Sequence, residues 1–140
     1  MQERYGRVSV ERVLSGPGPI ALYSALASLE GQETGPVSPE DIVSLALSGE
    51  SPLAIETEEI FCGWLGDVAG DVALMYVARG GVYLAGDILL TIFEILQRSQ
   101  FRHRFENKGR GIGIVTAIPT FLVSCESPVL RGCAYLLDSF

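Results

Sequence analysis

A glutamate near the start of a predicted helix is the first side chain in this sequence that could do chemistry. Glu11 lies two positions after Ser9, which can cap a short helix that runs through Ser15. A carboxylate only accepts hydrogen bonds, and it can take two hydroxyl donors in charge-assisted bonds. As an alternative, an acidic residue in a first helical turn needs no ligand, because the helix dipole favours it by about 0.3–1 kcal/mol. Both roles are compatible, since a position near a helix start orients the carboxylate.

Three glycines around a predicted strand form a second group of candidate positions. Gly80 and Gly81 end a long helix, and Gly86 follows the strand formed by residues 82–85. These glycines could line a ligand cleft, but glycines that separate a helix from a strand need no ligand. Asp87 is predicted to cap the next helix, a contribution of about 1 kcal/mol.

A basic segment from residue 98 to residue 110 holds half of the chain's ten basic residues. Such a segment could bind phosphate or nucleic acid. The chain as a whole carries a formal net charge of -7, however, which disfavours a nucleic acid or an anionic membrane as a partner. We therefore expect a solvated or ion-paired helix face, with His103 on the surface.

The three cysteines, Cys62, Cys125 and Cys133, form no CxxC pair, and the single histidine cannot complete a usual zinc site with them. The sequence favours buried, reduced thiols, and one reactive cysteine remains an alternative. No metal site is predicted.

The elements that must position these residues are mostly helices. Helices are predicted over residues 9–15, around 20–26 after a Gly-Pro-Gly-Pro elbow, over 38–47 and from Ser51 through Tyr76, the last being the longest. Gly63, Gly66 and Gly70 share one side of that long helix, which predicts close packing against a neighbouring helix. A helix bearing Ile88, Ile92 and Ile95, a strand near 120–123 and a last helix from residue 128 complete the series.

Only two strands are predicted, whereas a stable sheet usually has at least three. We therefore expect strands that precede Met1 or come from another subunit. The 140 residues fit one domain, 48% of them are hydrophobic, and no signal peptide or membrane-spanning run is predicted, so the protein is expected to be cytoplasmic.

Two stretches resemble bacterial glucokinases of the hexokinase and actin-like ATPase superfamily. The first is Val-Ser-Val-Glu-Arg-Val-Leu-Ser-Gly-Pro-Gly at residues 8–18, and the second is Ala-Arg-Gly-Gly-Val-Tyr-Leu-Ala-Gly at residues 78–86. Similarity at residues 101–110 and 117–120 extends the match over essentially the whole chain. The resemblance implies an α/β fold, with residues 1–140 forming the C-terminal part of an incomplete ribonuclease-H-like large domain, mostly helical with few strands, and with the N-terminal domain absent.

The resemblance also implies an activity, the transfer of the γ-phosphate of ATP, with Mg²⁺, to the 6-hydroxyl of glucose. The family's two phosphate loops, its catalytic base and its Gly-Glu-Gly-Gly-His sugar motif match nothing in this sequence, so the chain alone is expected to be inactive. Implied partners are glucose, the missing N-terminal kinase half and a second copy in a homodimer. The alternative is a non-catalytic remnant for dimerisation or sugar sensing.

Specific residues acquire roles from the same resemblance. Glu11 matches the glutamate that accepts hydrogen bonds from glucose hydroxyls. Gly86 matches the first glycine of an Ala-Gly-Gly-Ile turn beside the adenosine of ATP, and Gly80 and Gly81 would help to shape the nucleotide cleft. Asp87 replaces the second glycine of that turn, and Leu89-Leu90 stands where the family usually has Pro-Arg.

Overall fold

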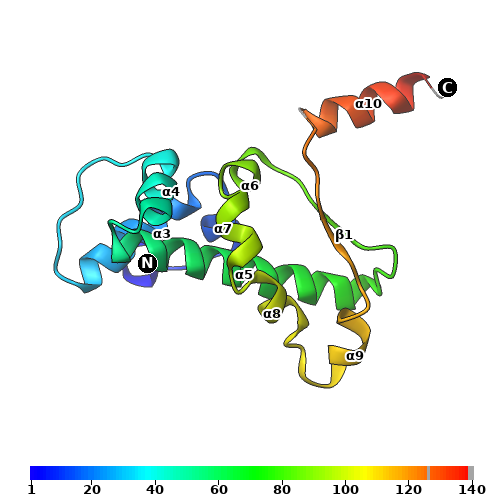
Figure 1. The fold of residues 1–140 in the computed structure, drawn as a ribbon, viewed down its shortest axis with the longest axis horizontal. Helices are drawn as coiled ribbons and strands as arrows, with labels where there is room; N and C mark the ends of the chain where they lie inside the picture. The colour runs from blue at the N-terminus through cyan, green and yellow to red at the C-terminus, as the bar shows by residue number, and fades with distance from the viewer. Residues whose placement is uncertain (126, 139–140) are drawn as a thin grey trace.

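The computed structural model describes residues 1–125 and 127–138, and of these the side chains of all except Glu3 and Arg4. The chain is mostly helical and carries a two-stranded sheet (Figure 1). The elements in chain order are α1 Gln2–Tyr5, α2 Val10–Val13, α3 Gly18–Leu29, α4 Pro39–Ser48, α5 Pro52–Tyr76, β1 Val82–Leu84, α6 Asp87–Thr91, α7 Phe93–Arg98, α8 Phe101–Glu106, a 3₁₀ turn Gly109–Gly111, α9 Ile112–Val115, β2 Thr120–Leu122 and α10 Pro128–Asp138.

The long helix α5 is the axis of the fold and confirms the predicted longest helix. Ser51 caps it by accepting a hydrogen bond from the backbone N–H of Ala54 at 3.2 Å, and Pro52 occupies its first position. The helix ends at Val77, whose backbone is left-handed, before the two predicted glycines are reached. Helices α3, α4 and α8 all pack on α5, so the two hydrophobic clusters of the chain both include residues of this helix.

The glycines of α5 let the backbone of α8 approach closely, as the sequence predicts. A Cβ at Gly66 would fall well inside contact distance of the carbonyl oxygen of Phe101, and one at Gly70 would meet that of Phe105. At Gly63 a Cβ would meet only the Arg104 side chain, at 3.9 Å. The glycine face is therefore filled by α8 from within the chain, which leaves no room for a second subunit at Gly66 and Gly70.

Helix α4 begins as its sequence predicts. The Ser38 hydroxyl accepts from the backbone N–H of Asp41 at 3.1 Å, and the Asp41 carboxylate accepts from the backbone N–H of Ser38 at 2.9 Å. This reciprocal capping box satisfies two amides that the helix itself leaves without partners. The hydrogen bonds to Asp41, first from the backbone and then from the side chain of Ser38, hold its pKa below the usual value.

The sheet consists of β1 and β2, which run parallel with Val82 opposite Thr120 and Leu84 opposite Leu122. Tyr83 and Phe121 lie side by side on one face, with ring centroids 5.0 Å apart. Tyr83 is 66% exposed, so this face of the sheet is largely uncovered in the described chain. Both predicted strands are confirmed, and the small size of the sheet agrees with the expectation of an incomplete one.

Two local predictions need correction. The apolar residues 88, 92 and 95 do not lie on one helix, because the backbone turns at Ile92 and separates α6 from α7. Their spacing continues through the turn, which is why periodicity alone could not detect it. Only Cys62 among the three thiols is buried, whereas Cys125 is half-buried and Cys133 is exposed.

Helix α10 lies apart from the body of the molecule (Figure 1). None of its described residues is buried, and several large apolar side chains are exposed, namely Val129, Leu130, Tyr135, Leu136 and Leu137. Within residues 1–125 and 127–138, no helix is both long enough and apolar enough to cross a lipid bilayer.

Candidate functional site

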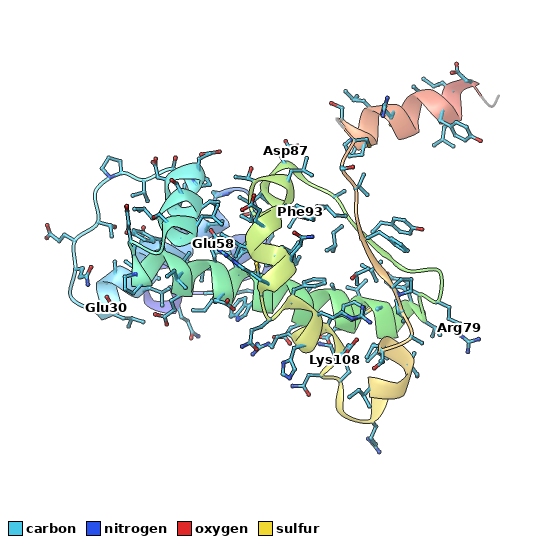
Figure 2. All side chains as sticks on the ribbon, in the orientation of Figure 1. Glu30, Glu58, Arg79, Asp87, Phe93 and Lys108 are labelled. Atoms are coloured by element: carbon cyan, nitrogen blue, oxygen red, sulfur yellow. The ribbon has the colours of Figure 1, made fainter. Side chains whose placement is uncertain are left out.

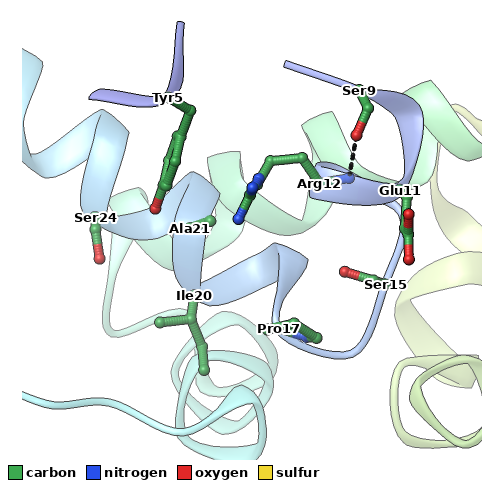
Figure 3. A pocket seen from close by; sticks show the side chains of 9 residues that line it. All are labelled: Tyr5, Ser9, Glu11, Arg12, Ser15, Pro17, Ile20, Ala21 and Ser24. Carbon is green, nitrogen blue, oxygen red and sulfur yellow. Dashed lines mark hydrogen bonds between the residues drawn. The ribbon is translucent and has the colours of Figure 1, made fainter. Parts of the chain in front are cut away.

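Glu11 lies in the first turn of α2, which begins where the sequence predicts. The Ser9 hydroxyl accepts a hydrogen bond from the backbone N–H of Arg12 at 3.3 Å and so caps the helix. The helix ends after Val13, two residues earlier than expected. The side chain of Glu11 is exposed and lines a pocket of about 580 Å³ (Figure 3).

This pocket is formed by α1, α2 and α3 together with the elbow that joins the last two. It is rich in hydroxyl groups, and the residues that line it are Tyr5, Ser9, Glu11, Arg12, Ser15, Pro17, Ile20, Ala21 and Ser24. The elbow confirms the predicted turn between the two helices: the backbone N–H of Gly18 donates to the carbonyl of Ser15 at 3.0 Å. Only glycine fits at position 18, because a Cβ there would overlap the carbonyl of the fully buried Val13.

Arg12 is the residue of this pocket that our sequence analysis missed as a candidate. Its guanidinium lies over the Tyr5 ring, 4.4 Å from the ring centroid, and points into the pocket between Tyr5 and Glu11 (Figure 3). Among the described side chains, no carboxylate forms an ion pair with Arg12. The sequence offered one signal for Arg12, its position directly after Glu11 in residues 8–18. Helix α2 turns the two side chains toward different parts of the pocket.

None of the three candidate glycines lines the pocket of Glu11. Gly81 has φ +114°, and a Cβ there would approach Phe121 to 2.7 Å, so packing between β1 and β2 explains this glycine without a ligand. Gly80 has open space around it. Gly86 has φ +144°, which L side chains rarely adopt, and nothing lies within 4 Å of where its Cβ would stand.

Asp87 is not the helix cap that we predict from the sequence. Gly86 occupies the capping position of α6, and the Asp87 side chain makes no capping hydrogen bond. The chain turns at Gly86, where φ is +144°, so Asp87 is the first residue of α6. Its exposed side chain lies at the N-terminal end of that helix (Figure 2). The helix dipole still favours a negative charge at this position.

The basic segment is an ion-paired face, as expected, and His103 is exposed. Arg104 donates from Nε to Oδ2 of Asp67 at 2.9 Å and also pairs with it through Nη2. Lys108 pairs with Asp71 at 2.9 Å and donates to the backbone carbonyl of Asp67 at 2.7 Å. These bonds join α8 and the turn after it to α5, and they leave little of this segment for a phosphate ligand.

A buried carboxylate in α5 escaped the sequence analysis. Glu58 is 0% exposed, and neither of its carboxylate oxygens has a hydrogen-bond partner among the described residues. Its removal from water raises its pKa to about 7. One helical turn later, burial raises the pKa of the Cys62 thiol to about 12, with a smaller contribution from the negative charges of Glu58 and Glu59 against a hydrogen bond from Ser99. Cys62 is therefore an unreactive thiol.

The described residues contain no group of three or more histidine, cysteine, aspartate or glutamate side chains that could hold a metal ion. The donors that a divalent cation would need are therefore not assembled within this part of the chain. The arrangement around Glu11 instead offers a carboxylate and several hydroxyl groups, with the Arg12 guanidinium in the same pocket.

Comparison with known proteins places these features in a family. A family model described as "Glucokinase" matches residues 1–139. A glucokinase of Nitrobacter hamburgensis is 46% identical over 136 residues, and one of Campylobacter jejuni subsp. doylei is 45% identical over 138 residues. These matches cover 97% and 99% of this chain, but the chain spans only 42% of the length of each relative.

A solved structure gives the same result in three dimensions. The crystal structure of a glucokinase from an Antarctic psychrotroph superposes with a TM-score of 0.88 at 36% sequence identity. The superposition covers 99% of this chain and 43% of that protein.

Proposed function

Because the chain belongs to the glucokinase family, we propose that it is part of an ATP-dependent kinase that transfers the γ-phosphate of ATP to the 6-hydroxyl of glucose. On this proposal, residues 1–140 are the C-terminal part of a ribonuclease-H-like large domain. The other kinase half supplies the catalytic base and the phosphate loops, so the chain alone does not turn over.

The observation that carries the proposal is the position of Glu11. Its carboxylate stands in a capped first turn and lines a pocket of about 580 Å³ in which Ser9, Ser15 and Ser24 offer further hydroxyl groups. A carboxylate can accept hydrogen bonds from two sugar hydroxyls, and each such charged bond contributes about 1.5–3 kcal/mol. We assign Glu11 to binding and orienting glucose, and we assign no catalytic residue to this chain.

For the nucleotide we propose an approach at Gly86. This residue follows the carboxyl end of β1, the side of a parallel sheet where ligands of α/β proteins usually bind, and its backbone is open. Gly80 and Gly81 precede the amino end of the same strand, so they would support the nucleotide only indirectly. ATP supplies the phosphoryl group and Mg²⁺ neutralises its charge. We assign no magnesium ligand to the described residues.

The chain's further partners are also proposals. Uncovered apolar surface on the sheet face and on α10 is consistent with a missing kinase half and with a homodimer. A non-catalytic role in sugar sensing or dimerisation is the second candidate. Asp87 favours it, because its carboxylate stands directly beside Gly86 and would crowd or repel a nucleotide bound there.

The experiment compares Glu11→Gln with Glu40→Gln. Both glutamates occupy the second position of a serine-capped helix, but only Glu11 lines the pocket. By titration calorimetry on a full-length protein that contains this segment, Glu11→Gln should weaken glucose binding by about 1.5–3 kcal/mol with little effect on ATP affinity, whereas Glu40→Gln should leave glucose binding unchanged. Equal affinities in all three proteins would refute the sugar role of Glu11.

A coupled phosphorylation assay on the purified chain of residues 1–140 alone should give no turnover. Turnover that depends on glucose and Mg²⁺ and survives removal of contaminating host kinase would show that the catalytic parts lie within these residues.

A further inference from the structure

Arg102 ties helix α8 to the turn that leads into β2. Its Nη1 donates to the carbonyl of Ile118 at 2.9 Å and its Nη2 to the carbonyl of Thr116 at 3.1 Å, partners that lie 16 and 14 residues away in the sequence. Its Nε donates to Oε1 of Glu106 at 2.6 Å. The guanidinium also lies over the ring of the fully buried Phe105, 4.8 Å from the ring centroid. Helix α8 therefore fixes the orientation of this guanidinium, and both Nη groups are directed at the backbone of another segment.

The geometry of these bonds requires an arginine. The carbonyls of Thr116 and Ile118 follow the end of α9, where a helix leaves its last carbonyl groups without partners of its own. Basic side chains can satisfy such groups. A guanidinium holds its donors in one rigid plane, so a single arginine can bond two carbonyls and a carboxylate at the same time. A lysine ammonium is a point charge without this fork, so it would hold the turn less firmly.

The turn that Arg102 holds is in direct contact with the start of β1. Pro119 follows Ile118, and its carbonyl accepts a hydrogen bond from the backbone N–H of Val82 at 2.9 Å. A Cβ at Gly81 would stand 3.2 Å from the same carbonyl oxygen, so the two segments approach closely here. Within residues 1–125 and 127–138, the three residues of β1 pair with β2 alone. The position of β1 therefore depends on the turn that precedes β2.

We propose that Arg102 is a positioning residue for the nucleotide, because it fixes the turn that holds β1 and thereby the backbone of Gly86. Gly86 follows the last residue of β1 by two positions, so a displacement of this short strand is carried to it. Arg102 acts through Pro119 and Val82 and is assigned no contact with ATP. This role rests on the proposed function, which places the nucleotide at Gly86, whereas the bonds from Arg102 to the turn stand without it.

The test measures ATP and glucose affinity by titration calorimetry on a full-length protein that contains this segment. Arg102→Gln should weaken ATP binding about tenfold, and Arg102→Lys should weaken it less. Glucose affinity should stay unchanged in both variants. The reason is that α2, which carries Glu11, packs through Val13 in one hydrophobic cluster, whereas Ile118 lies in the other.

Arg104→Gln is the matched control. Arg104 lies on the same helix, its side chain is 42% exposed against 39% for Arg102, and it also donates to a carboxylate, that of Asp67 on α5. Its replacement should leave both affinities unchanged. Hydrogen exchange on the same proteins locates the cause, because the amide of Val82 donates to Pro119 and should exchange faster in Arg102→Gln but not in Arg104→Gln.

Four results would overturn the positioning role: ATP affinity unchanged in Arg102→Gln, an equal loss of ATP and glucose affinity, unchanged exchange at Val82, or the same losses in Arg104→Gln. Circular dichroism identifies unfolding, and Arg102→Lys decides the matter by the same criteria if Arg102→Gln does not fold.

Failure of this role and failure of the proposed function give different results. If ATP affinity depends on Arg102 but the full-length protein phosphorylates no glucose, the proposed function fails and the positioning role stands. If the protein phosphorylates glucose and its ATP affinity does not depend on Arg102, the positioning role fails and the proposed function stands. A full-length protein that binds no ATP would overturn both.

Discussion

Replacing Glu58 should make the protein more stable above neutral pH. This carboxylate is 0% exposed and its oxygens have no partner among the described residues, so its pKa rises from 4.5 to about 7. The folded state therefore holds its proton more tightly than the unfolded state does. The contribution of Glu58 to the free energy of unfolding is therefore highest below about pH 4.5, falls as the pH rises toward 7, and stays low above it.

The size of the effect follows from the two pKa values. The rise in the pKa of Glu58 from 4.5 to about 7 corresponds to about 3 kcal/mol of destabilisation once the carboxyl group is ionised. Glu58→Gln removes the charge but remains polar, so it should stabilise the chain by about that amount at pH 8 and by little at pH 4.5. Glu58→Leu also removes the unpaired polar atoms, and it should therefore stabilise at both pH values.

The assay is urea unfolding followed by circular dichroism at pH 4.5 and pH 8. Glu56→Gln is the matched control, because Glu56 lies on the same helix two residues earlier and is exposed, and its replacement should change stability by less than about 0.5 kcal/mol at either pH. A stability difference between wild type and Glu58→Gln that is the same at both pH values would refute the reasoning, because it would mean that ionisation of Glu58 does not destabilise the folded state.

Two further substitutions test the packing and the capping of the helices. Gly66→Ala should destabilise the chain by about 1–3 kcal/mol through overlap of its Cβ with the carbonyl of Phe101. Gly63→Ala has room for its Cβ and should stabilise the chain by up to about 1 kcal/mol. Thermal unfolding measures both changes, and a change in stability of the same sign in the two variants would contradict the packing of α8 on α5. Ser38→Ala should raise the pKa of Asp41 part of the way to its ordinary value, because it removes the hydrogen bond from the Ser38 hydroxyl and leaves the one from the backbone N–H of residue 38. An unchanged carboxyl titration by NMR would show that the Ser38 hydroxyl does not bond to Asp41 in solution.

The sequence allowed prediction of those features that depend on neighbouring residues. The Ser38-Pro39-Glu40-Asp41 start of α4 follows from local capping chemistry, and it forms as expected. Gly66 could be assigned to a helix contact because a glycine inside a helix is costly without one. Glu11 could be placed in a capped first turn for the same local reason.

The features that the sequence did not reveal depend on the third dimension. Three glutamates lie close together between residues 56 and 59, and nothing in their type distinguishes the buried one. The apolar residues Ala54, Phe61 and Cys62 at helical spacing around Glu58 were the available signal in the sequence. The cap of α6 was misassigned because the φ of +144° at Gly86 had no local signature. The placement of Arg12 in the pocket depends on Tyr5, which approaches it from another helix.

The parallel pairing of β1 with β2 has a consequence for the order in which the chain folds. Parallel neighbours cannot be joined by a tight turn, and the whole segment from α6 to α9 lies between Leu84 and Thr120. Three paired residues offer too little to offset the entropy of closing so long a loop, so the strands meet only after the intervening helices have docked on α5. The last structure to form is also the first to open. Hydrogen exchange should therefore be faster at the amides of Val82 and Val123, which bond to Pro119 and Leu84, than in the middle of α5.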